Sequence, residues 1–108
     1  MGIFRRRSRD PFTIADHVSS GDFRMVVTDC FFITGRGVVV TGAVEAGAVG
    51  IGDRVTVQRA GQAIRTLQIG GIEHDRRLVK RAAAGESVGL LFRGTAKDEI
   101  LQGDVIHT

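Results

Sequence analysis

The sequence predicts an all-β domain, and three observations carry this prediction. Apolar and polar residues alternate at period two in several short segments, which is typical of strands with one face toward a core. Glycine occurs 15 times and proline once, and the glycines separate runs rich in valine and isoleucine, as in tight turns between short strands. No segment of about 30 residues has the pattern of a strand, a helix and a second parallel strand. The sequence therefore favours an antiparallel barrel or sandwich over a doubly wound fold.

Strand and turn signals follow one another in a regular order along the chain. A Gly-Arg-Gly triplet at positions 35–37 reverses the chain, and a Gly-Gly pair at positions 70–71 marks a bulge or sharp bend. Residues 75–85 are expected to form a short helix or a loop, and residues 96–100 one helical turn. The expected strands cover residues 23–34, 38–47, 53–59, 63–74, 86–94 and 103–108.

Charge divides the chain into a basic N-terminal arm and a nearly neutral body. The body, residues 23–108, is long enough to be a single domain with a core that needs no disulfides. The arm, residues 1–22, is expected to be flexible or to hold one short helical turn. Such an arm suits contacts with phosphates or an anionic surface, and a solvated tail is the alternative. Its basic residues are Arg5, Arg6, Arg7 and Arg9, all within the first nine positions, and the residues after these nine include 11 basic and 12 acidic ones, a net charge of −1.

Composition also limits the compartment and the chemistry. Cys30 is the only cysteine and has no partner for a disulfide within the chain, so a reducing cytoplasm is the expected compartment. No apolar run approaches the ~20 residues that span a bilayer, and the first ten residues lack the apolar centre of a secretion signal. The three histidines are far apart, and no nucleophile lies next to a base in the sequence. We therefore expect a cytoplasmic protein without a metal site, a cofactor or catalytic residues.

Two long segments contain an ordered set of motifs. The first, DCFFITGRGVVVTGAVEAGAVGIGDRVTV at positions 29–57, has an aromatic before I-x-G-R-G, then VVVTG-x-VE-x-G and a hydrophobic-GD turn. The second, GIEHDRRLVKRAAAGESVGLLFRGTAKDEILQGDVI at positions 71–106, has GIE, a VG-hydrophobic stretch ending in RG, and an I-x-x-G-x-V close. In order and spacing these motifs resemble the second domain of the translational GTPases, above all elongation factor Tu and its relatives.

The resemblance implies a closed antiparallel β-barrel of about six to seven strands, of the translation-protein second-domain type, preceded by a short flexible or partly helical N-terminal arm. In that family a separate preceding domain binds nucleotide through a GxxxxGK[ST] loop. The chain contains no such loop and no Asn for the guanine-reading motif, and the residues before Phe23 leave no room for a GTPase domain. Nucleotide binding is therefore not expected, and the protein is not expected to be an enzyme.

The resemblance also implies candidate site residues, because the second domain of elongation factor Tu helps to hold the aminoacylated 3′ end of transfer RNA. Phe31 corresponds to an aromatic near the terminal nucleotide, Glu73 to an acid beside the terminal adenosine, and Arg76 to an arginine near the acceptor end. An aromatic ring stacks on a base, a carboxylate accepts from a hydroxyl or amine, and arginine binds phosphate. Arg36, which lies between two glycines, is a fourth candidate for contact with a partner.

Each candidate has a structural alternative. The period-two pattern places Phe31 on the same strand face as Val27, which favours a core position over a stacking platform. Glu73 and Arg76, three residues apart, also fit a surface ion pair worth under ~1 kcal/mol. Arg36 also fits a role that family members use to dock their own GTPase domain.

Further basic contacts are expected from the arm arginines and from a cluster after the GIE motif, namely Arg77, Lys80 and Arg81. A solvated loop is the alternative for this cluster. The family often has basic residues at the positions of Ala43 and Ala46. Their absence removes positive charge from a corner that would face a partner, which lowers any affinity that depends on phosphates.

We therefore expect a stand-alone, non-catalytic binding module whose ligands are RNA, above all the tRNA acceptor end, or a protein of the translation machinery. A protein-interaction or regulatory module that kept the barrel and lost RNA binding is the second interpretation. A remnant that works in trans with a GTPase is the third. No membrane or nucleotide partner is expected, and fold alone does not decide between these functions.

Overall fold

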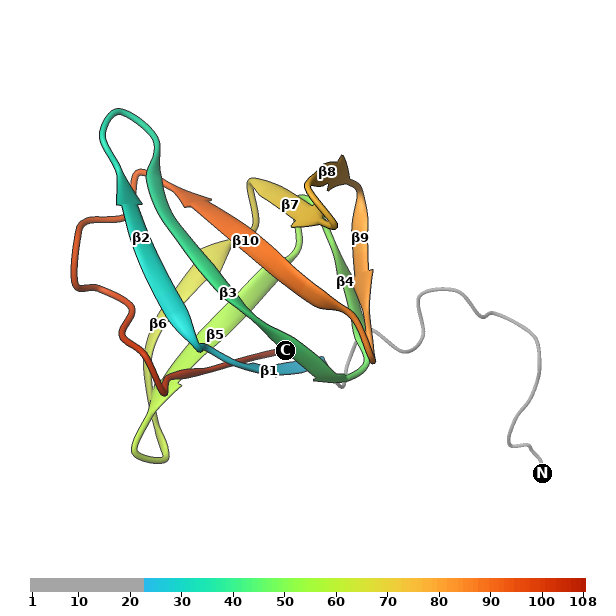
Figure 1. The fold of residues 1–108 in the computed structure, drawn as a ribbon. Coiled ribbons are helices and arrows are strands. Elements are labelled where there is room, and N and C mark those ends of the chain that lie inside the picture. Colours follow the sequence, from blue (N-terminus) through green and yellow to red (C-terminus); the bar gives the residue numbers. More distant parts are fainter. Residues whose placement is uncertain (1–22) are drawn as a thin grey trace, which may run out of the picture.

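The computed structural model describes residues 23–108 of the chain. The predictions for the arm, including Arg5, Arg6, Arg7 and Arg9 as basic contacts, concern residues outside this part. Within residues 23–108 the chain forms strands joined by turns and no helix (Figure 1). A helix long and apolar enough to cross a bilayer is accordingly absent from these residues. The prediction of an all-β fold is confirmed.

Eleven strands make up the described part of the chain. Bulges and bends divide two of the expected strands, so that residues 23–34 give two strands and residues 63–74 give two more. The expectation of a helix or loop over residues 75–85 is wrong, because two short strands lie there and pair with other strands. The strands are β1 (Arg24–Val26), β2 (Asp29–Ile33), β3 (Gly37–Ala46), β4 (Ala48–Gly50), β5 (Arg54–Arg59), β6 (Gln62–Gln68), β7 (Gly71–His74), β8 (Arg77–Val79), β9 (Arg81–Ala83), β10 (Ser87–Arg93) and β11 (Val105–His107).

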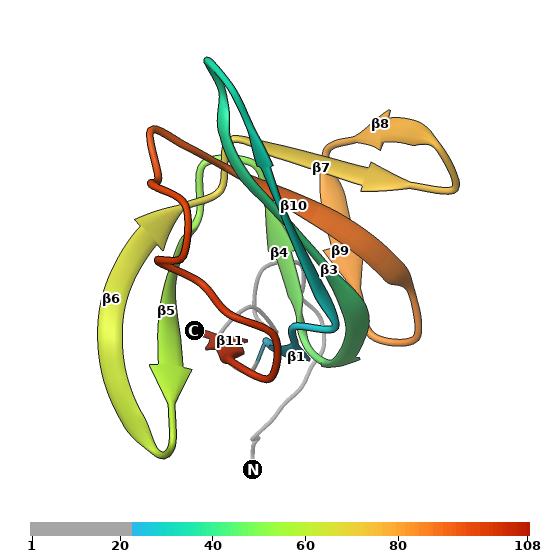
Figure 2. The same cartoon turned by 60° about the vertical axis from the view of Figure 1, so that its left-hand side comes forward.

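The strand pairs are all antiparallel. The main sheet follows the order β6-β5-β11-β1-β3-β10-β7-β8, and β4 pairs separately with β9. β3 is long enough to pair with β10 along one edge and with both β2 and β1 along the other. Figures 1 and 2 show that the sheet curls around a single interior. Within residues 23–108, β6 and β8 are not hydrogen-bonded to each other, so strand pairing does not close the expected barrel at this point.

The core lies inside the curled sheet. Val38 and Val40 of β3 are 2% and 0% exposed, whereas Val39 and Thr41 beside them are half-buried on the outer face. Full burial of an aliphatic or aromatic side chain contributes about 1.5–3 kcal/mol, so this interior supplies most of the stability of the fold. The largest fully buried side chains are Phe23, Phe92, Met25, Ile69, Ile72, Leu90, Ile100, Ile106, Val27, Val40, Val49 and Val55.

A β-bulge between β1 and β2 changes which side chains face the core. Thr28 donates its backbone N–H to the Thr41 carbonyl at 2.7 Å, and the next residue, Asp29, is also the partner of Thr41. Thr28 and Asp29 therefore both lie opposite Thr41, and the alternation of inward and outward side chains shifts by one position after them. As a result Phe31 lies on the outer face with 53% of its surface exposed. The core position expected for Phe31 is wrong.

An ion pair between the buried Asp104 carboxylate and the partly exposed Arg59 guanidinium ties the loop before β11 to the end of β5. The Asp104 carboxylate accepts two hydrogen bonds of 2.8 Å from the Arg59 guanidinium and one of 2.8 Å from the Leu101 backbone N–H. Burial alone raises the pKa of the Asp104 carboxyl, but the hydrogen bonds from Arg59 and Leu101 outweigh it, so this pKa lies below its ordinary value. The carboxylate therefore stays ionised at neutral pH and holds the loop against the sheet.

Candidate functional site

The outer face of β2, β3, β10 and β7 brings distant parts of the sequence together. Cross-strand partners point to the same side of a sheet, so a row of partners identifies side chains that lie together. In one row Phe31 is opposite Val39, Val39 is opposite Leu91, and Leu91 is opposite Gly71. This row begins with an exposed aromatic ring, continues through two half-buried aliphatic side chains and ends at a residue without a side chain.

A second, parallel row carries the polar groups. Its members are Asp29, Thr41, Gly89, Glu73 and Leu78, on β2, β3, β10, β7 and β8 respectively. Neighbouring strands lie about 4.8 Å apart, so β2 and β7 are separated by about 14 Å. The face therefore places an aromatic edge and an acidic edge on either side of a shallow centre.

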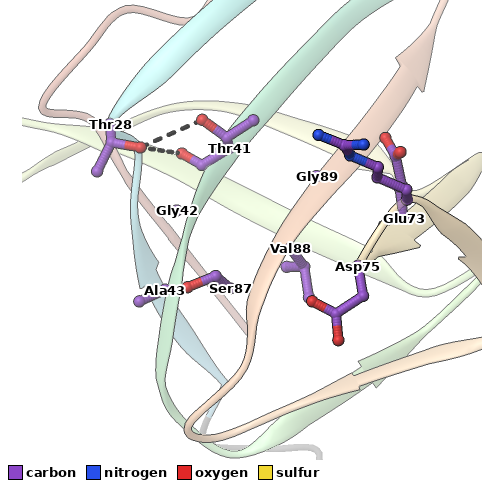
Figure 3. Close-up of a pocket in the computed structure, with 10 residues that line it drawn as sticks. Thr28, Thr41, Gly42, Ala43, Glu73, Asp75, Ser87, Val88 and Gly89 are labelled. Carbon is purple, nitrogen blue, oxygen red and sulfur yellow. Dashed lines mark hydrogen bonds between the residues drawn. The ribbon is translucent and has the colours of Figure 1, made fainter.

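A hollow of about 440 Å³ opens on this face (Figure 3), and we call it the polar hollow. The carboxylates of Glu73 and Asp75 lie on one side of it and the hydroxyls of Thr28 and Thr41, 3.2 Å from each other, on the other side. These groups suit hydrogen bonding to sugar hydroxyls and amines. The hollow is lined by Thr28, Thr41, Gly42, Ala43, Glu73, Asp75, Arg76, Ser87, Val88 and Gly89.

A second hollow of about 310 Å³ adjoins the first, and we call it the apolar hollow. Glu73 and Gly89 line both hollows, so the two adjoin on the sheet, and we call them together the depression. Leu78, which is 88% exposed, stands at its rim. The apolar hollow is lined by Ile33, Arg36, Val39, Ile51, Gly70, Gly71, Ile72, Glu73, Leu78, Val79, Gly89, Leu91 and Arg93.

Two glycines keep the floor of this depression open. A Cβ atom added to Gly89 would lie 3.5 Å from the Val39 side chain, and one added to Gly71 would lie 3.5 Å from the Leu91 side chain. Both are ordinary contacts, and neither glycine has the positive φ that excludes other residues. The fold itself therefore tolerates alanine at both positions, and the missing side chains allow another molecule to approach the backbone closely.

Arg76 holds an unfavourable backbone conformation at the tip of the β7–β8 hairpin. Asp75 and Arg76 have φ values of 54° and 65°, the geometry of a turn that favours Asn-Gly. A non-glycine residue in this region costs about 1–2 kcal/mol. Such a cost is typical of positions where the side chain has a use, and the Arg76 side chain lines the polar hollow.

We expect Arg76→Gly to raise the free energy of unfolding by about 0.5–1 kcal/mol. The substitution relieves the left-handed conformation, and the greater freedom of glycine in the unfolded chain offsets part of this gain. Urea unfolding of the wild type and the variant measures the difference. A loss of stability would contradict the interpretation, because it would mean that the Arg76 side chain contributes packing that the fold requires.

The other predicted site residues fall into two groups, those that line a hollow and those that do not. Glu73 and Arg76 form no ion pair in the described part of the chain, and both line the polar hollow. Arg36 is exposed at the tip of the β2–β3 hairpin and lines the apolar hollow. The cluster Arg77, Lys80 and Arg81 lines neither hollow. Among residues 23–108 no group of three or more acidic, histidine or cysteine side chains is placed to hold a metal.

Sequence reasoning missed several residues of the depression, namely Thr28, Thr41, Val39, Leu91 and Arg93. The outward positions of β3 are visible in its period-two pattern. However, the pairing of β3 with β10, about 50 residues later, decides which outward residues lie together. Only the register of the sheet reveals this neighbourhood.

Comparison with known proteins places this chain in a family. The model of the family described as elongation factor Tu domain 2 matches residues 37–107. The chain belongs to the elongation factor Tu domain 2 family. The match covers Glu73, Arg76 and the whole of β3, β10 and β7, and it begins immediately after Arg36. The family suggested by the sequence motifs is therefore confirmed.

Solved structures show the same relationship. The apo form of translation elongation factor SelB from Methanococcus maripaludis has a TM-score of 0.72 and 28% sequence identity, over 83% of this chain and 19% of that chain. A bacterial selenocysteine-specific elongation factor, EF-Sec, has a TM-score of 0.69 and 24% identity, over 86% of this chain and 16% of that chain, which shows the fold alone. This elongation factor Tu domain 2 chain therefore spans less than a fifth of the length of either factor.

Proposed function

We propose that this chain is a non-catalytic module that binds the single-stranded 3′ end of an RNA, such as a tRNA acceptor end, on the outer face of β2, β3, β10 and β7. One observation carries the proposal. Arg36, Glu73 and Arg76 come from two separate stretches of sequence, yet they line two adjoining hollows with a glycine floor. The exposed ring of Phe31 lies on the same face of the sheet, opposite Val39, which lines the apolar hollow.

The chemistry of the depression matches an unstacked RNA end. Phe31 offers an exposed ring for stacking, the Glu73 carboxylate accepts from a sugar hydroxyl or an exocyclic amine, and Arg76 binds phosphate. The open floor at Gly71 and Gly89 admits a flat base against the sheet. None of these groups requires a bound nucleotide or a catalytic step, which supports a binding role.

We expect Phe31→Ala and Arg76→Ala each to weaken the binding of a short CCA-ended RNA by about tenfold or more. Base–aromatic stacking contributes about 1–3 kcal/mol, and a hydrogen bond between charged partners contributes about 1.5–3 kcal/mol. Loss of one phosphate contact also lowers the slope of log affinity against log salt by about 0.7. Fluorescence anisotropy of labelled RNA at several salt concentrations measures both quantities.

Matched control variants are available for both substitutions. Phe32 is 49% exposed, but its partner is the inward-facing Val38, so Phe32→Ala removes a neighbouring ring from the opposite side of β2. Arg54 is an exposed arginine that lines neither hollow. Equal losses of affinity for Phe32→Ala and Phe31→Ala, or for Arg54→Ala and Arg76→Ala, would contradict a specific surface and indicate binding by charge and hydrophobicity alone.

A protein partner is the second candidate function, and a specific observation favours it. Exposed aliphatic side chains gather around the apolar hollow, where Ile51 is 50% and Leu78 88% exposed. Clusters of this kind mark interaction surfaces in small domains. Leu78→Ser distinguishes protein binding from RNA binding, because an aliphatic side chain contributes nothing to phosphate binding. If Leu78→Ser abolishes capture of a translation-related protein and leaves RNA affinity unchanged, the protein-binding function is supported.

A further inference from the structure

Two arginines line the apolar hollow and form no ion pair with the part of the chain that the structure describes. Arg36 lies in the β2–β3 turn, and Arg93 is the last residue of β10. Arg93 is the cross-strand partner of Gly37, and the next backbone N–H, that of Gly94, donates to the Arg36 carbonyl at 3.0 Å. The backbone positions of the two arginines are therefore neighbours across the β3–β10 pair, and both side chains line the apolar hollow. Neither forms an ion pair with any other residue between 23 and 108.

The Arg93 side chain packs over Gly70, a residue without a side chain in the connection between β6 and β7. A Cβ atom added at Gly70 would lie 3.1–3.3 Å from Cγ, Cδ and Nε of Arg93. The arginine side chain therefore lies flat against the Gly70 backbone. This contact restricts the side chain before any ligand arrives, which lowers the entropic cost of binding.

Two arginine side chains that line one hollow and form no ion pair among residues 23–108 suit the binding of an anion. The planar donor fork of arginine matches the geometry of a phosphate group and allows paired hydrogen bonds. The site also continues into an apolar space lined by Val39 and Leu91. The chemistry fits a phosphate group attached to a flat, weakly polar body, such as a nucleoside.

We propose that Arg36 and Arg93 form a phosphate subsite that binds a backbone phosphate of the RNA, a proposal that rests on the proposed function. Arg93 lies four positions along β10 from Gly89, the partner of Glu73, so the Cα atoms of Arg93 and Gly89 are about 13 Å apart. The RNA chain then runs along β10, with its terminal nucleoside at Glu73 and Arg76 and a phosphate nearer the 5′ end at Arg36 and Arg93. This arrangement assigns a polarity to the bound strand.

The test compares variants of the full chain with a short CCA-ended RNA, with adenosine 5′-monophosphate and with inorganic phosphate. We expect Arg36→Gln and Arg93→Gln each to weaken RNA binding about fivefold to tenfold and to reduce the salt slope by about 0.7. Arg54→Gln, the matched control, is expected to change neither quantity beyond a general charge effect. Gly70→Ala keeps the net charge and displaces the Arg93 side chain, so it is expected to weaken RNA binding without the loss of a cation.

The outcomes separate this proposal from the proposed function. If RNA binds and the Arg36 and Arg93 variants bind as tightly as the Arg54 variant, the phosphate subsite is overturned and the RNA-binding function stands. If RNA fails to bind but phosphate and adenosine 5′-monophosphate shift the backbone amides of Arg36, Gly70 and Gly94, the two arginines do bind phosphate, but the assignment of this phosphate to an RNA chain falls together with the proposed function. If RNA, adenosine 5′-monophosphate and phosphate all fail to bind, the phosphate subsite and the RNA-binding function are both overturned.

Discussion

Gly37→Ala is expected to lower the free energy of unfolding by about 3–5 kcal/mol, enough to unfold much of the domain. A Cβ atom at this position would lie 2.2 Å from the Phe92 carbonyl oxygen and 3.0 Å from the Arg93 Cα. Those atoms belong to the backbone of β10, which pairs with β3 over seven residues and has no freedom to move away. The φ of Gly37 is 140°, so strain adds to the overlap.

Gly89→Ala provides the control for this prediction. Its added methyl group makes only a 3.5 Å contact with the Val39 side chain, so we expect a change in stability within about 1 kcal/mol. Thermal and urea unfolding of both variants measure the difference. If Gly37→Ala were as stable as Gly89→Ala, the register of β3 and β10 described above would be wrong, and the outer face built on it would lose its basis.

The second large effect is expected from the ion pair between Arg59 and Asp104. Asp104→Ala removes three hydrogen bonds from a site where the side chain is 2% exposed, and we expect a loss of about 2–4 kcal/mol at neutral pH. Because the pKa of Asp104 is lowered in the folded state, the stability it contributes is present above its unfolded pKa, about 3.9. This contribution is lost as the pH falls through the lower, folded pKa.

Arg59→Met is expected to reverse this pH dependence. Without the guanidinium, the burial of Asp104 is opposed mainly by the Leu101 hydrogen bond, so the pKa of the carboxyl rises. A raised folded pKa gives stability at low pH that is lost as the pH increases. Unfolding of the wild type and both variants between pH 3 and pH 7 measures the slopes. Parallel slopes for the wild type and Arg59→Met would rule out the ion pair between Arg59 and the buried Asp104 carboxylate as described.

Local patterns predicted most of the fold, and long-range pairing decided the rest. The Gly-Arg-Gly triplet at positions 35–37 and the valine run of β3 placed the first hairpin correctly, because turn geometry and strand alternation are local properties. The side on which Phe31 lies depended on a bulge at Thr28 and Asp29, and no residue type marks that bulge in the sequence. The strands β8 and β9 were missed because each has only three residues, and their basic residues hide the alternation of apolar and polar side chains in so short a segment.

The candidate site shows the same division. Glu73 and Arg76 followed from the GIE motif, and they do line one hollow. The alternative expectation, a surface ion pair between Glu73 and Arg76, is not met in the described residues. Arg93 was not predicted, because its proximity to Arg36 arises from the hydrogen bond between Gly94 and Arg36 across the sheet. Residues that act together across strands become visible only when the register is known.

The most direct test of the central claim is a titration of isotope-labelled protein with a short CCA-ended RNA, followed by backbone amide shifts at two salt concentrations. The account predicts shifts along β2, β3, β10 and β7, centred on Phe31, Glu73 and Arg76, that persist at the higher salt concentration. Shifts confined to the arginines at positions 5–9 and lost in salt would contradict it and leave only non-specific attraction. Absence of any shift would likewise contradict RNA binding at this face and favour a protein partner.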